Sequence, residues 1–98
     1  MLNFYVVKDE QPNSNSLKKV TMELAGSLHE QAFEDLQQKK MIEERFDYYS
    51  DFRWSRGQVH QKFTQLKTQS TKEASVVTFL AILEKAVHQQ SGLMAYSD

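Results

Sequence analysis

Hydrophobic positions near the two ends of the chain predict β-strands. Residues 2–7, LNFYVV, form a short apolar run rich in β-branched and aromatic types, and the polar stretch KDEQPNSNS follows with the only proline. Such a run is typical of a buried strand that ends in a loop. Near the C-terminus, residues 93–96 follow Gly92 and predict an extended segment that pairs with one of the early strands.

The stretch 17–38 supports two interpretations. Apolar residues stand at every second position in 20–24, which places their side chains on one face of a strand. Apolar residues of the same stretch also recur at helical spacing, so one long helix over 17–38 is the alternative. Gly26 and Ser27 favour a break, and therefore a strand followed by a separate helix.

Three capping boxes predict three helices. In a capping box, a serine hydroxyl and a glutamate or glutamine three residues later satisfy each other's free backbone donors where a helix begins. Ser27 and Glu30 predict a helix over 28–40, and Ser55 and Gln58 predict a second one. The buried positions of this second helix are expected to be Val59, Phe63 and Leu66.

The third box, formed by Ser70 and Glu73, predicts a helix over 72–90 with the most regular apolar stripe in the chain. The predicted order is strand, strand, helix, aromatic segment, helix, helix, strand. This order indicates the α+β class, with a small antiparallel sheet of about three short strands and three helices packed on it. A mostly α-helical bundle is the alternative. With 98 residues, the chain has enough apolar surface for one core, so a single domain over 1–98 is expected.

Composition narrows the possible functions. Twelve basic and 13 acidic residues give a formal net charge of −1 without a broad positive field, so nucleic acid is not an expected partner. The absence of cysteine excludes disulfides, thiolate metal sites and cysteine nucleophiles. The first ten residues lack a basic region, and their apolar run is too short for a signal peptide or a membrane span. We therefore expect a cytoplasmic protein without a membrane partner.

The motifs that would indicate catalysis or metal binding are incomplete. His29 and Glu30 begin like the H-E-x-x-H zinc helix, but Phe33 stands where the second histidine is needed. The three glycines are isolated from one another, so a glycine-rich phosphate loop is missing, and no serine lies in a G-x-S-x-G turn. We therefore expect no metal, no cofactor and no enzymatic activity.

Residues 46–55, FDYYSDFRWS, hold five of the eleven aromatic residues and follow neither a helical nor a strand period. One interpretation places Phe46, Phe52 and Trp54 in the core. The other is a recognition surface, because rigid Tyr, Trp and Arg side chains supply large contact areas at low entropic cost. The charges in and around the segment cannot all be buried unpaired. The candidate partner-binding residues are Glu44, Asp47, Tyr48, Tyr49, Asp51, Arg53, Trp54 and Arg56.

Three pieces of the chain, LNFYVVKDE, IEERFDYYSDFRW and GLMAYSD, together resemble the small single-domain immunity proteins that bacteria encode beside polymorphic toxins, including contact-dependent growth inhibition systems. The resemblance covers both ends and the middle of the chain, and it carries over no catalytic position. It implies a cytoplasmic protein that neutralises a cognate toxin domain by tight binding, usually by covering the toxin's active site.

Two other functions are compatible with the same residues. A homo-oligomeric adaptor, such as a homodimer, would pack the aromatic segment against a second copy across a two-fold axis. A small enzyme would use His60, Asp51 or Glu44 as acid or base, with Arg53 or Arg56 as an anion clamp. The enzyme is the less favoured of the two, since no motif in the sequence requires it.

Overall fold

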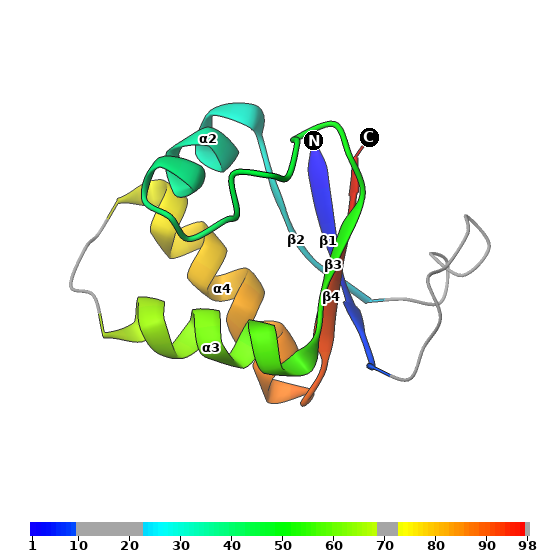
Figure 1. Ribbon diagram of the computed structural model, residues 1–98. Helices are drawn as coiled ribbons and strands as arrows, with labels where there is room; N and C mark the ends of the chain where they lie inside the picture. The colour runs from blue at the N-terminus through cyan, green and yellow to red at the C-terminus, as the bar shows by residue number, and fades with distance from the viewer. Residues whose placement is uncertain (10–22, 69–72, 98) are drawn as a thin grey trace.

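The computed structural model describes residues 1–9, 23–68 and 73–97. Within these residues the chain forms a four-stranded antiparallel sheet and three helices, which confirms the α+β class (Figure 1). The strands are β1 (Leu2–Val7), β2 (Glu23–Leu28), β3 (Phe52–Trp54) and β4 (Gly92–Ser97). The helices are α2 (Glu30–Gln38), α3 (Arg56–Lys67) and α4 (Ala74–His88). The alternative of a helical bundle is therefore wrong.

The sheet has the order β2-β1-β4-β3, so the first and last strands of the chain are neighbours at its centre. The residue pairs Leu2 with Ser97 and Val7 with Gly92 mark the two ends of the β1–β4 pairing. All the helices of Figure 1 lie on the same face of the sheet. Alternating side chains of the central strands point toward them and form the core with the buried face of α4.

The second strand differs from its predicted position. β2 spans Glu23–Leu28 and includes Gly26 and Ser27, where a break was predicted, whereas residues 20–22 lie outside the described part of the chain. The prediction failed because Gly26 serves packing instead of a turn. A Cβ at Gly26 would lie 2.6 Å from Cγ1 of Ile82, so the strand approaches α4 more closely than any side chain would allow.

The first helix begins later than predicted. Ser27 is a β2 residue whose hydroxyl donates a hydrogen bond to Asn3 Oδ1 of β1, so it does not cap α2. The N-cap is His29, whose Nδ1 accepts a hydrogen bond from the backbone N–H of Ala32 at 3.4 Å. Leu28 is buried at the end of β2, and α2 is shorter than the predicted range 28–40.

The other two helix starts have different outcomes. The box of Ser55 and Gln58 is confirmed, because both of its reciprocal hydrogen bonds are present at the start of α3. The N-cap of α4 is Glu73, which makes no side-chain capping bond, and Ser70 lies outside the described residues. The helix ends at His88, two residues before the predicted boundary. Among the described residues, no helix combines the length and the apolar character needed to cross a membrane.

Candidate functional site

The aromatic segment divides between the core and the surface, and its core part belongs to β3. Phe52 and Trp54 point toward the helices, and they are 7% and 1% exposed. The ring of Phe46 stacks on Phe52 with centroids 4.3 Å apart, and Trp54 stacks on Phe4 of β1 at 5.8 Å. Strand alternation directs the ring of Trp54 into the core, as the first of the two interpretations of this segment predicted, so its ring is not exposed for a partner.

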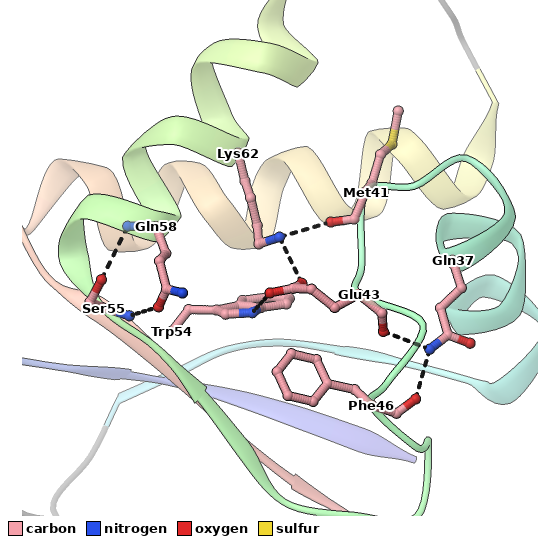
Figure 2. A network of polar contacts seen from close by, with 8 residues as sticks. All are labelled: Gln37, Met41, Glu43, Phe46, Trp54, Ser55, Gln58 and Lys62. Carbon is pink, nitrogen blue, oxygen red and sulfur yellow. Dashed lines mark hydrogen bonds and ion pairs between the residues drawn. The ribbon is translucent and has the colours of Figure 1, made fainter.

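Glu43 ties the chain ahead of the aromatic segment to β3 and α3 (Figure 2). Its carboxylate accepts hydrogen bonds from Trp54 Nε1 at 3.3 Å and from Lys62 Nζ at 2.9 Å. Lys62 Nζ also donates to the carbonyl oxygen of Met41 at 3.2 Å and lies 4.7 Å from the centre of the Trp54 ring. This cluster joins three separate segments, which are the start of the loop before β3, β3 itself and α3.

The electrostatics of this cluster favour the charged form of Glu43. Partial burial by itself raises the pKa of Glu43, but the hydrogen bonds from Lys62, a backbone N–H and Trp54 outweigh it. The pKa therefore lies below its ordinary value of 4.5. A carboxyl group with a depressed folded-state pKa stabilises the fold above its ordinary pKa, and this contribution is lost as the pH falls through the folded value.

The lowered pKa of Glu43 predicts that its contribution to stability depends on pH. The Glu43→Gln variant is expected to be less stable than the wild type by up to about 1 kcal/mol at about pH 7, a modest value because the ion pair is partly solvated. As the pH falls below 4.5, the difference between the two proteins is expected to disappear, because Glu43 of the wild type becomes protonated. Urea unfolding of both proteins at several pH values measures this difference in stability. A difference that stays constant as the pH falls below 4.5 would contradict an electrostatic role.

Residues 43–51 form a loop between α2 and β3, called here the 43–51 loop. Its backbone closes two turns, through the hydrogen bonds from Phe46 N to Glu43 O at 3.1 Å and from Ser50 N to Asp47 O at 3.0 Å. The carboxylate of Asp47 also accepts a hydrogen bond from the N–H of Tyr49 at 3.0 Å, which is an Asx turn. These bonds give the loop a defined conformation without regular secondary structure.

The tyrosines of the 43–51 loop stand next to α2. The ring of Tyr48 is half-buried and meets Phe33 of α2 edge to face, with centroids 5.7 Å apart. Tyr49 is 65% exposed, and its ring contacts that of Tyr48 at 5.1 Å. Its hydroxyl donates a hydrogen bond to Glu30 Oε1 at 3.2 Å, which raises the pKa of Tyr49. The loop therefore presents an aromatic surface beside an acidic helix.

A cleft of about 380 Å³ separates α2 from the loop, with carboxylates on both sides. Glu30 and Glu34 come from α2, Glu44 and Asp47 come from the loop, and Arg45 is the basic residue in the lining. We define the acidic-tyrosine face by six residues, Glu30, Glu34, Glu44, Asp47, Tyr48 and Tyr49. Four of them were candidates from the sequence, whereas the two glutamates of α2 were missed. Their spacing of one helical turn on an exposed face was the available signal.

The remaining candidates lie in β3 or close to its two ends, outside the acidic-tyrosine face. Asp51, which precedes the strand, accepts a hydrogen bond from the backbone N–H of Ser97 at 3.0 Å. Arg53 donates to the carbonyl oxygen of Lys8 at 2.7 Å, and the backbone N–H of Arg56 donates to Asp9 Oδ1 at 2.8 Å. The two arginines thus contact the turn that follows β1, and the structure does not gather all eight candidates into one site.

A second cleft, of about 510 Å³, lies between the starts of α2 and α4. Asp35 accepts hydrogen bonds from the Ser75 hydroxyl and from Lys39, which hold its pKa below the ordinary value. Lys39 also pairs with Glu73 at 2.7 Å, and together these carboxylates raise the pKa of Lys39. Lys39 thus links Asp35 of α2 to Glu73 at the start of α4, and these ion pairs hold the two helices together beside the cleft.

No group of three or more His, Cys, Asp or Glu side chains in 1–9, 23–68 and 73–97 is arranged to hold a metal ion. His60, the base of the alternative enzyme, is exposed on α3, and its carbonyl oxygen accepts a hydrogen bond from the Thr64 hydroxyl. Comparison with protein-family models, curated proteins and solved structures gave no match. The function is therefore inferred from the geometry of this chain.

Proposed function

We propose that this chain is a non-enzymatic binding protein, an immunity protein that neutralises a cognate bacterial toxin domain by direct contact. The observation that carries the proposal is the acidic-tyrosine face. This face has an exposed tyrosine ring, and backbone hydrogen bonds give its loop a defined conformation. Its carboxylates come from two segments, α2 and the 43–51 loop. Tyrosine is enriched among the residues that dominate binding energy, because its ring is large and loses few rotamers. The resemblance of LNFYVVKDE, IEERFDYYSDFRW and GLMAYSD to immunity proteins supports the same function.

The charge of the face indicates the kind of surface that the toxin domain presents. Four carboxylates against Arg45 leave the cleft negative, so the complementary surface is basic. Opposite charges speed the encounter of two proteins and exclude wrong partners, whereas buried aromatic anchors supply most of the affinity. Tyr49 is the expected anchor, and the carboxylates around it are expected to select the partner.

The test of this function is co-expression with the toxin domain that the neighbouring gene encodes. Bacteria that produce the C-terminal domain of the upstream gene product are expected to stop growing, and co-expression of this chain is expected to restore growth. The two purified proteins are expected to form a stable complex in which the 43–51 loop is protected. Absence of both rescue and complex would refute the proposal.

Within such a complex, Tyr49→Ala is expected to weaken binding by at least about thirtyfold, as removal of a central aromatic anchor does. The Gln65→Ala variant, which changes an exposed residue of α3, is the matched control and is expected to bind like the wild type. Isothermal titration calorimetry measures both. Equal affinity of the two variants would show that the toxin domain binds elsewhere on the surface.

A homodimer through the same face is less compatible with the charges. Two copies would bring Glu30, Glu34, Glu44 and Asp47 of each chain toward the same residues of the other, and like charges in contact oppose association. Light scattering of the purified protein separates the two functions. A stable dimer that buries Tyr49 would favour the adaptor, whereas a monomer with an exposed Tyr49 would favour a foreign partner.

A further inference from the structure

One side-chain nitrogen of α2 binds two backbone carbonyl oxygens of the 43–51 loop. Gln37 is half-buried near the C-terminal end of α2, and its Nε2 donates two hydrogen bonds (Figure 2). One goes to the carbonyl oxygen of Glu43 at 3.0 Å and the other to that of Phe46 at 2.7 Å. These two carbonyls belong to the residues that close the first turn of the loop. Gln37 therefore donates to two backbone carbonyl oxygens that would be paired with backbone N–H groups in a strand or helix.

The position of Gln37 on α2 connects it with the acidic-tyrosine face. Glu30, Glu34 and Gln37 are spaced by four and three residues, so they lie along one side of the helix, and all three line the cleft toward the loop. The Tyr49 hydroxyl also binds Glu30 of this stripe, but it does so through an exposed side chain and not through the loop backbone. The other polar attachments of the loop lie at its two ends. Lys62 and Trp54 bind Glu43 where the loop begins, and Ser97 binds Asp51 where it ends. Gln37 thus binds the loop backbone itself, between the two halves of the face.

We propose that Gln37 is a positioning residue for partner recognition, which rests on the proposed function. By bonding two loop carbonyls, it holds the 43–51 loop at one separation from Glu30 and Glu34. A surface that is already ordered before association loses less conformational entropy on binding and so binds more tightly. The primary amide suits this task because its one nitrogen carries two hydrogens and no charge. A carboxylate of the same shape would instead present only acceptors to two carbonyl oxygens.

The test compares Gln37→Glu with Gln38→Glu. Both variants add one negative charge to the end of α2, but Gln38 is exposed, so the second variant controls for charge alone. Gln37→Glu is expected to speed amide hydrogen exchange in the loop by about tenfold, because two hydrogen bonds are lost. Affinity for the neighbouring toxin domain is expected to fall by about tenfold as well. Gln38→Glu is expected to change neither quantity.

A double-mutant cycle then shows whether Gln37 acts through the loop. If it positions the Tyr49 ring, the effect of Gln37→Glu on affinity is expected to shrink when Tyr49 is already alanine. Additive effects would overturn this role, and so would wild-type affinity in Gln37→Glu or faster exchange across the whole sheet. If the wild type itself fails to bind the toxin domain, the proposed function fails. Loop exchange in the free protein would still confirm or refute that Gln37 holds the loop.

Discussion

Replacing Trp54 with alanine is expected to lower the free energy of unfolding by about 3–5 kcal/mol, the range for a fully buried tryptophan. The side chain is 1% exposed, and its ring contacts Phe4, Phe52 and Phe79 from three different elements. A domain of this size has a total stability of about 5–15 kcal/mol, so the variant is expected to be partly unfolded at physiological temperature. Urea unfolding followed by far-UV circular dichroism measures the loss without needing tryptophan fluorescence.

Two further variants define the cause of this loss. Tyr49→Ala removes an exposed ring from the same segment and is expected to leave the unfolding midpoint nearly unchanged. Trp54→Phe keeps a ring in the core but loses the hydrogen bond to Glu43, so an intermediate loss is expected. If Trp54→Ala unfolded at the wild-type urea concentration, the placement of this ring in the core would be wrong.

The second large effect is expected for Gly92→Ala, which should destabilise the fold by about 3 kcal/mol through overpacking. Gly92 is the first residue of β4, and a Cβ there would lie 2.3 Å from the carbonyl oxygen of Trp54. It would also lie 3.0 Å from the carbonyl carbon of Ser55 and 3.2 Å from the nitrogen of Arg56. All three are backbone atoms, so the clash is relieved only if the junction of β3 and α3 moves.

Gly57→Ala is the matched control for this substitution. Gly57 lies in the first turn of α3, and the nearest atom to a Cβ there is the Ser55 hydroxyl oxygen at 3.9 Å, an ordinary contact. Alanine in a helix is favoured over glycine by about 0.5–1 kcal/mol, so this variant is expected to be slightly more stable than the wild type. Thermal unfolding of both variants gives the comparison. Similar shifts of the same sign would show that Gly92 is not constrained by β3.

The acidic-tyrosine face shows how much of the candidate site could be predicted from the sequence. Glu44, Asp47, Tyr48 and Tyr49 were candidates because they are close together in the chain, and the structure keeps them together on one loop. Trp54 was placed with them, although strand alternation turns it inward. Glu30, Glu34, Gln37 and Lys62 were missed as parts of the same region. They reach it from two helices, and local spacing does not contain that information.

Elements whose own pattern is strong were determined by the sequence alone. The apolar run of β1, the box of Ser55 and Gln58 at α3 and the apolar stripe of α4 depend on neighbours within a few residues, where backbone propensity and side-chain periodicity act. The α+β class followed from the order of these elements. What the sequence determined was therefore the kind of structure that each strongly patterned segment adopts.

The conformation of segments with a weak sequence pattern was decided only by the tertiary structure. β3 has three residues and exists because it pairs with β4, about forty positions later in the chain. Gly26 lies in a strand that packs closely against Ile82 of α4, and Gly92 lies where the backbone of Trp54 comes close to β4. The conformation of the 43–51 loop likewise depends on Gln37 and Lys62. Such contacts join residues that are distant in the sequence, so they stabilise the chain only once it is folded. Propensity and periodicity within a short segment therefore cannot predict them.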